Sequence, residues 1–246
     1  NDFILVEATA LKGSAAALAR RLSDRRRGMG ADGLLIVDKK KRAFRYLNAD
    51  GSETFCGNGA RCAAVWLSRQ RRFVGSEISF HGAAGELKAR ILGPGRAAVI
   101  MPEPRLIRGT FALTAARRRW RLQLWNSGVP HAVVPVKNLA SAPVLEAGRA
   151  LRRHRVFGKA GANVDFIAKR GKAVALRTYE RGVEAETFAC GTGAVAAALA
   201  AETLRWGSLP MAVYPSSGQP LKVYRRSGHL WLEGPARIVF KGEINP

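Results

Sequence analysis

The sequence predicts an α+β protein of two similar domains, and three observations lead to this prediction. A Cys-Gly-x-Gly-Ala unit occurs twice, at residues 56–60 and 190–194, each time after a Glu-Thr pair and before an alanine-rich stretch. Short segments of β-type composition, separated by glycine-containing turns, occur in both halves of the chain. The two cysteine units lie roughly one domain length apart, so a duplicated domain accounts for them.

Strands are expected to dominate both halves. Residues 81–85 and 93–95 have the composition of turns, so the segments around them predict a meander in an antiparallel or mixed sheet. The expected strands are residues 3–7, 34–37, 43–47, 77–80, 86–91 and 97–101, then 121–124, 132–136, 174–179, 213, 221–224, 230–233 and 236–240.

Four helices are expected, at residues 14–27, 60–70, 142–155 and 194–206. The second and fourth follow the cysteine units directly. Residues 194–201 are apolar on nearly every side, and a helix of that kind is buried at the centre of a domain. The sequence therefore predicts a mostly antiparallel sheet packed against a central helix in each domain.

The composition excludes several classes of protein. No apolar run approaches about 20 residues, which argues against a membrane-spanning helix. Three cysteines among 246 residues do not suggest a disulfide framework, and the four histidines have no zinc-binding spacing. We therefore expect a cytoplasmic protein without a metal. The chain starts without Met, and we expect a few residues to precede Asn1.

The net charge of +23 is extreme, and such a field attracts anions. The basic runs at residues 25–27, 39–42, 117–119 and 152–153 are scattered over both halves. Most of them are expected to be solvated surface. A basic nucleic-acid-binding module remains a third hypothesis, and it predicts salt-sensitive binding that does not depend on the cysteines. No known nucleic-acid-binding motif accompanies the basic runs, so nucleic acid is not the expected partner.

Each cysteine unit places a thiol at the start of a predicted helix. The first N–H groups of a helix have no intrahelical partner and carry the positive end of its dipole. A thiolate is stabilised there, and a substrate carboxylate can bind beside it. If Cys56 and Cys190 faced one carbon from opposite sides, one could remove a proton while the other returned one. This arrangement predicts a racemase or epimerase. Cys62 has no second copy and is expected to be structural.

The motifs resemble those of the diaminopimelate epimerase family. Residues 1–3 resemble the end of its N-terminal motif, and residues 28–33 resemble its next glycine-rich turn. Residues 48–53 and 56–62 are similar to its first signature almost residue for residue. Residues 179–182, 186–187 and 190–194 resemble its second signature. These motifs span nearly the whole chain in the expected order.

The resemblance implies interconversion of LL- and meso-diaminopimelate, in lysine and peptidoglycan-precursor biosynthesis, without pyridoxal phosphate (PLP), any other cofactor or a metal. Cys56 and Cys190 would be the catalytic acid and base, and His131 and Glu180 would tune or orient the thiols. The substrate-binding residues that it implies are Asn1, Asn48, Gly57, Asn58, Asn163, Glu180, Arg181, Gly191 and Thr192.

The resemblance also implies curled sheets, with the active site in the interdomain cleft. The duplication of the cysteine unit suggests a boundary near residues 111–113, so the N-terminal domain would comprise residues 1–112, completed by residues 236–246, and the C-terminal domain residues 113–235. A homodimer is expected, acting on a small-molecule amino acid away from membranes. Val129 stands where many members carry a substrate-binding Asn, which favours a sister racemase for histidine or proline derivatives as the alternative. The second signature also has an extra residue between Gly182 and Glu186.

Overall fold

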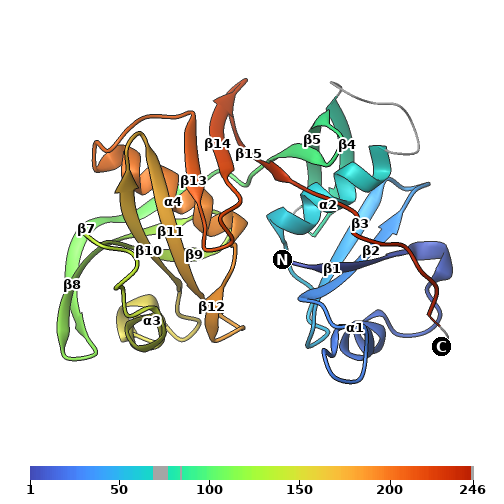
Figure 1. The fold of residues 1–246 in the computed structure, drawn as a ribbon, viewed down its shortest axis with the longest axis horizontal. Coiled ribbons are helices and arrows are strands. Elements are labelled where there is room, and N and C mark those ends of the chain that lie inside the picture. Colours follow the sequence, from blue (N-terminus) through green and yellow to red (C-terminus); the bar gives the residue numbers. More distant parts are fainter. Residues whose placement is uncertain (69–76, 84, 245–246) are drawn as a thin grey trace. The chain divides into compact units, whose positions relative to one another are not determined.

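The computed structural model describes residues 1–68, 77–83 and 85–244, and the chain divides into two units (Figure 1). Unit 1 contains Asn1–Val99 and Glu233–Pro246, and unit 2 contains Ile100–Leu232. Helices and a mixed, mostly antiparallel set of strands make up both units, as the α+β prediction required. No helix within the described ranges is both long and apolar enough to cross a membrane.

Unit 1 is a curled sheet with one helix on each of its faces. The strands follow the order of the sequence, with β1–β2 and β3–β4 parallel and the other pairs antiparallel. Leu34 and Ile36 point toward α1, whereas Leu35, the residue between them, contacts the start of α2. The elements are β1 (Phe3–Glu7), a short 3-10 helix (Ala8–Ala10), α1 (Ala15–Ser23), β2 (Gly33–Asp38), β3 (Ala43–Asn48), α2 (Gly57–Ser68), β4 (Glu77–Gly82), β5 (Gly85–Gly93) and β6 (Arg96–Ile100).

Unit 2 has the same plan with more strands. Its sheet has the order β15-β14-β13-β11-β10-β9-β8-β7, with β12 paired to β11. The β9–β10 and β11–β13 pairs are parallel. The elements are β7 (Arg105–Ala115), β8 (Arg118–Asn126), β9 (Pro130–Pro135), α3 (Val144–Arg152), a 3-10 helix (Arg155–Phe157), β10 (Asn163–Arg170), β11 (Ala173–Glu180), β12 (Ala185–Thr187), α4 (Gly191–Thr203), β13 (Met211–Tyr214), β14 (Leu221–Arg226) and β15 (His229–Pro235).

Helix α4 is the central helix of unit 2. It packs against β8, β9, β10, β11, β13 and β14, and residues 193–201 are all buried. Small alanine side chains allow strands to approach the helix on every side. In unit 1, α2 takes the equivalent place and packs against β2, β3, β4 and β5. The expectation that the two alanine-rich helices are central is therefore confirmed.

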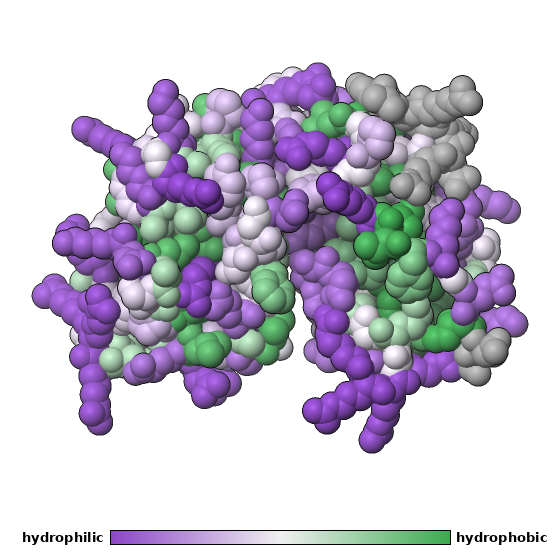
Figure 2. All heavy atoms as spheres, viewed as in Figure 1, coloured by the Kyte–Doolittle hydropathy of each residue, from purple (hydrophilic) through white to green (hydrophobic). Residues whose placement is uncertain are grey.

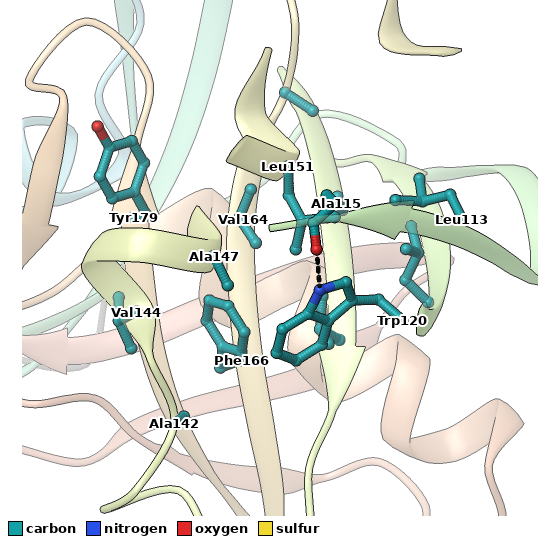
Figure 3. Close-up of a cluster of buried hydrophobic side chains, with 14 of the residues drawn as sticks. Leu113, Ala115, Trp120, Ala142, Val144, Ala147, Leu151, Val164, Phe166 and Tyr179 are labelled. Carbon is teal, nitrogen blue, oxygen red and sulfur yellow. Dashed lines mark hydrogen bonds between the residues drawn. The ribbon is translucent and has the colours of Figure 1, made fainter. Parts of the chain in front are cut away.

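The outer face of the unit 2 sheet carries a second core beneath α3 (Figure 3). Trp120 lies edge-on to Phe166, with ring centroids 5.8 Å apart, and its indole N–H donates to the carbonyl of Ala115 at 3.0 Å. Val144 and Ala147 bring α3 onto this core. Because α3 and α4 cover opposite faces, the central strands of unit 2 are buried on both sides.

Several sequence expectations are corrected. Residues 236–240 form no strand, although the chain does return to unit 1 at Glu233. The units divide between Val99 and Ile100. The boundary expected near residues 111–113 instead falls inside β7, which pairs with β8. The strands β7, β10 and β12 were not expected over most of their lengths. Both cysteine helices begin directly after the thiol, three residues earlier than expected, and residues 69–70 of the second expected helix lie outside the described ranges.

Long hydrophilic side chains project from both units on the face drawn in Figure 2, with smaller hydrophobic areas between them. The chain has 41 Lys and Arg residues and a net charge of +23. Ion pairs such as Arg45–Glu53 and Arg96–Glu233 engage only part of this charge, because the chain has 18 acidic residues to set against it.

Candidate active site

The two repeated cysteines begin their helices in the same way. Gly59 N–H donates to the sulfur of Cys56 at 3.3 Å, and Gly193 N–H donates to the sulfur of Cys190 at 3.4 Å. Each sulfur thus occupies the N-cap position, where a Ser or Asp oxygen normally accepts a hydrogen bond from the first helical turn. Within the described residues, all three cysteines are free thiols. The duplication seen in the sequence is therefore also a duplication of local geometry.

The second glycine of each Cys-Gly-x-Gly-Ala motif permits this geometry. A Cβ added at Gly59 would lie 3.0 Å from a methyl group of Leu35, and one added at Gly193 would lie 2.7 Å from Oδ1 of Asp165. In both units a side chain at this position would enter space that a strand residue already fills. Glycine therefore lets the start of each central helix lie directly against the sheet.

In unit 1, hydrogen bonds connect the start of α2 to the first residue of the chain. Asn58 Nδ2 donates to Oδ1 of Asn1, and Asn1 Nδ2 donates to Asp32 at 2.8 Å. Asp32 also accepts from Arg25 at 2.8 Å. Two of the predicted substrate-binding residues, Asn1 and Asn58, are thus brought together beside Cys56. Asn48 lies in a separate turn, where its amide donates to Ser52 Oγ at 3.0 Å.

Arg25 also anchors the segment that follows Asn1. Its guanidinium bonds to both carboxylate oxygens of Asp2, at 3.0 and 2.8 Å. These hydrogen bonds are the main reason that the pKa of Asp2 is lowered. Asp2 and Arg25 are exposed and Asp32 is half-buried, so we expect the ion pairs to fix the geometry of the segment more than to stabilise the fold.

Arg61 is a buried cation in α2, one turn beyond the thiol. Its side chain is buried, and its Nη2 donates to Asn58 Oδ1 at 2.8 Å. Its Nε and Nη1 have no hydrogen-bond partner among the described residues. Burial is the main cause that lowers the pKa of this guanidinium, and the charges of the Cys62 and Cys56 thiolates act in the opposite direction. Sequence analysis had not singled out Arg61.

In unit 2, strand register gathers polar side chains on the face that α4 covers. Asn163 pairs with His131 on the neighbouring strand, and Asp165 pairs with Thr178 on the other side. Alternate residues of a strand point to the same face, so Asn163 and Asp165 share a face. Neither His131 nor Asp165 has any exposed surface.

These buried groups are joined by short hydrogen bonds that lead to the thiol. His131 Nδ1 lies 2.6 Å from Asp165 Oδ2, and His131 Nε2 lies 2.9 Å from Thr192 Oγ1. The Thr192 hydroxyl lies 3.4 Å from the sulfur of Cys190. Thr178 Oγ1 donates to the second oxygen of Asp165 at 2.7 Å. The predicted tuning residue His131 is therefore connected to Cys190 through Thr192.

The surroundings of the Cys190 thiol raise its pKa. Burial raises its pKa well above the ordinary value of 9.0, and the negative charges of Glu180 and Asp165 raise it further. Hydrogen bonds from Thr192 and from Gly193 N–H act in the opposite direction. Cys56 is less buried, and the charge of its thiolate interacts with the buried guanidinium of Arg61. The two thiols thus share the same backbone geometry, and Cys190 is the more deeply buried of the two.

The remaining predicted residues of unit 2 surround the same helix start. Asn163 Oδ1 accepts from Arg181 N–H at 2.8 Å, and Glu180 accepts from Thr187 Oγ1 at 2.7 Å. Gly191 and Thr192 form the first turn of α4. Asp165, like Arg61, was missed by the sequence analysis; its only signal was a carboxylate within an otherwise apolar run. Within the described ranges, no three Cys, His, Asp or Glu side chains are grouped so as to hold a metal.

Comparison with known proteins gives the family. The model of the family described as diaminopimelate epimerase matches residues 1–107 and 124–230. The chain belongs to the diaminopimelate epimerase family. A relative of that name from Hydrogenobaculum sp. is 32% identical over 100% of this chain and 92% of its own length. Another, from Chlorobaculum tepidum, is 36% identical over 99% of this chain and 97% of its own length.

Solved structures with this fold include more distant proteins. A probable proline racemase from Agrobacterium radiobacter K84 is 17% identical with a TM-score of 0.65, covering 88% of this chain and 77% of the racemase. A phenazine biosynthesis protein of the PhzF family from Enterococcus faecalis is 15% identical with a TM-score of 0.67, covering 99% of this chain and 92% of that protein. At such identities the likeness establishes the fold, and the activity of this family member must be argued from its own residues.

Proposed function

We propose that this protein interconverts LL- and meso-diaminopimelate, with Cys56 and Cys190 as the acid and base. The observation that carries the proposal is the matched pair of thiols, each capping the central helix of its own unit. Relatives at 32–36% identity that bear the name diaminopimelate epimerase support the choice of substrate. The activity belongs to lysine and peptidoglycan-precursor biosynthesis.

The mechanism needs both thiols at one substrate. One thiolate removes the α proton, and the thiol of the other cysteine delivers a proton to the opposite face of the same carbon. The first-turn N–H groups at Gly57, Asn58, Gly191 and Thr192 would hold the carboxylate of the reacting centre and stabilise the negative charge that develops on it. Exclusion of water from the site would strengthen these interactions. No residue in this scheme requires PLP or a metal.

The direct test follows LL-diaminopimelate by NMR in D₂O under reducing conditions. Deuterium should enter at one α carbon while the meso form appears. Cys56→Ala and Cys190→Ala should both abolish this reaction, because each removes one of the two proton carriers. Cys62→Ala is the matched control, since Cys62 lies in the helix that Cys56 caps and has no counterpart in unit 2. Full activity of either catalytic variant would refute the two-thiol mechanism.

Arg181 is proposed to bind the distal carboxylate of the substrate. It follows β11 directly, its backbone N–H is fixed by Asn163, and it takes part in no ion pair among the described residues. A guanidinium binds a carboxylate through two parallel hydrogen bonds. Arg181→Ala should raise KM for diaminopimelate with a smaller effect on kcat. An unchanged KM would place the arginine outside the substrate site.

A second candidate function is a sister racemase for histidine or proline derivatives. Val129 is the observation that favours it, because this half-buried residue, in the turn before β9, offers no amide to a polar substrate. The same D₂O experiment with a panel of L-amino acids separates the candidates. Exchange with another amino acid, and none with diaminopimelate, would move the assignment to the sister racemase.

We also propose a homodimer in the reducing cytoplasm, as the family resemblance implies. The free thiols within the described residues suit a reducing compartment. Light scattering coupled to size-exclusion chromatography tests the assembly, and a monomeric mass in the active protein would refute it.

A further inference from the structure

Asp165, His131, Thr192 and Cys190 form a continuous hydrogen-bonded chain within unit 2, and Asp165 has no part in the function proposed above. The successive separations are 2.6, 2.9 and 3.4 Å. The four residues come from β10, β9 and the start of α4. Strand register and the N-cap geometry thus bring them together, although they are far apart in the sequence.

One continuous direction of donation pairs the members of this chain, from Cys190 toward Asp165. Thr178 Oγ1 donates to Oδ1 of the carboxylate, and Oδ2 lies 2.6 Å from His131 Nδ1, which donates to it in this arrangement. His131 Nε2 then carries a lone pair, which lies 2.9 Å from the Thr192 hydroxyl and 3.4 Å from Asn163 Nδ2. The Thr192 hydroxyl donates to that lone pair, and its oxygen, 3.4 Å from the sulfur, accepts the S–H of Cys190.

We propose that Asp165 is a positioning residue that enables His131, through Thr192, to take the thiol proton of Cys190. The S–H bond breaks and its proton passes to Thr192 Oγ1, while the hydroxyl proton of Thr192 passes to His131 Nε2. The products are a thiolate and an imidazolium, with the hydroxyl restored. Asp165 stays ionised, and the total charge of the group does not change.

The surroundings of Cys190 explain why such a relay is needed. The titratable groups facing this thiol are Glu180 from β11, Asp165 from β10 and His131 from β9. Two of them are carboxylates, and both raise the pKa of the buried thiol. A thiolate formed alone would therefore be strongly opposed. Forming it together with an imidazolium neutralises the new charge locally, and a carboxylate on the far side of the ring stabilises that imidazolium.

Gly193 gives independent geometric support. A side chain at this position would meet Asp165 Oδ1 at 2.7 Å, so the carboxylate lies directly against the first turn of α4. A buried carboxylate in a strand interior costs stability unless it is fully hydrogen-bonded. Here it is bonded by Thr178 and His131 and lies beside a helix start, where the dipole favours negative charge. The fold thus accommodates a charge that the packing of the core does not require.

The test measures how the alkylation rate of Cys190 by iodoacetamide depends on pH, by mass spectrometry of the cysteine peptide. Each pH profile is followed to its high-pH plateau, and the rates are expressed relative to that plateau, so that differences in access to the buried sulfur cancel. In Asp165→Asn, the loss of the carboxylate should slow alkylation at neutral pH about tenfold, the effect of a one-unit rise in thiol pKa. Cys56, in unit 1, is the internal control and should not change.

The opposite outcome is equally definite. If Asp165 acted only through its negative charge, Asp165→Asn would lower the pKa of Cys190 and speed its alkylation. An unchanged or faster rate overturns the relay. Thr192→Val serves as a second variant if Asp165→Asn does not fold, and it should slow alkylation in the same way. Thr192→Ser keeps the hydroxyl and should restore the wild-type profile.

The relay rests on the proposed acid/base role of Cys190, yet its test uses no substrate. Epimerisation by the wild type, combined with an unchanged alkylation profile in Asp165→Asn, would keep the proposed function and reject the relay. Slower alkylation in Asp165→Asn, combined with no epimerisation by the wild type, would keep the relay and reject the substrate assignment. For an active enzyme, Asp165→Asn should also lower kcat with little change in KM.

Discussion

Arg61 holds the side chain of Asn58 in a single orientation. Its Nη2 donates to Oδ1 of the amide at 2.8 Å, so the amide must present its Nδ2 to Asn1. Two further nitrogens of this buried guanidinium have no partner among the described residues. Burying a cation without a carboxylate opposes folding, and it is tolerated where function gains from it.

Replacing this arginine should therefore separate stability from activity. Arg61→Met keeps the length of the side chain and removes the buried charge, so the melting temperature should stay the same or rise. Activity should fall about tenfold or more, because the orientation of Asn58 is lost. Thermal unfolding and the D₂O exchange assay measure the two effects. Arg61→Lys keeps a charge and serves as the control. Lower stability with unchanged activity would contradict this account.

Gly193→Ala should damage both stability and the thiol site. The new methyl group would come within 2.7 Å of Asp165 Oδ1, and overpacking of this kind costs about 1–3 kcal/mol. Gly207→Ala is the matched control, because its Cβ would meet its nearest neighbour at an ordinary 3.4 Å and should change stability by less than about 0.5 kcal/mol. Urea unfolding distinguishes the two variants. Equal stabilities would mean that the start of α4 can shift away from the sheet.

Stability should fall with rising pH above about pH 9, and Cys190 should contribute to the fall. The folded protein keeps the thiol proton because the pKa of Cys190 is raised, whereas the unfolded chain loses it near the ordinary value of 9.0. The unfolded state then binds fewer protons, so the free energy of unfolding decreases until the pH passes the folded pKa. The slope approaches about 1.4 kcal/mol per pH unit for one group.

Urea unfolding with reductant, between about pH 8 and pH 10.5, tests this effect. Cys190→Ala should show a shallower slope than the wild type, whatever its stability at neutral pH. The pKa of Cys62 is also raised by burial, so the Cys62→Ala/Cys190→Ala double variant should be shallower still. Parallel slopes for all three proteins would show that the thiols titrate alike in the folded and unfolded states.

Arg177→Ala should destabilise unit 2 without removing any hydrogen bond to a cysteine thiol. The guanidinium binds both carboxylate oxygens of Glu186, at 2.8 and 2.6 Å, and also donates to three backbone carbonyls in residues 139–142. Hydrogen bonds to charged groups are each worth about 1.5–3 kcal/mol. We expect a loss of at least about 2 kcal/mol in urea unfolding. Arg119→Ala, at an exposed position, is the control and should be nearly neutral.

The sequence predicted those features of the fold that depend on local patterns. Ser14 caps α1 through its hydroxyl, and each cysteine unit begins a helix, because capping depends on residues that are close in sequence. Strand β10 was missed because helices cover both of its faces, and a strand buried on both sides has no polar alternation. In β7, residues 105–110 are all exposed and the pairing register shifts twice, so no period of two remains.

Residues 236–240 show the opposite error. Their composition is strongly β-forming, yet Val239 is 90% exposed and Phe240 is 67% exposed, because a strand also needs a partner edge.

The prediction of the site from sequence has the same limit. Both thiols were predicted from local motifs, whereas the contact of Asp165 with His131 spans 34 positions and arises only from strand register. The burial of Arg61 likewise depends on the strands that pack against α2.

The return of the chain at Glu233 affects the order in which the protein can be completed during synthesis. Glu233 pairs with Arg96 at 2.8 Å, and Ala236 N–H donates to the carbonyl of Gly95 at 2.8 Å, so unit 1 is completed by residues that are made after all of unit 2. Unit 2, by contrast, is formed by one continuous stretch of chain, residues 100–232. Domains usually fold in the order in which they are made. Here the half that is translated first is completed last, so Cys56 remains in an incomplete unit until residues 233–236 have left the ribosome.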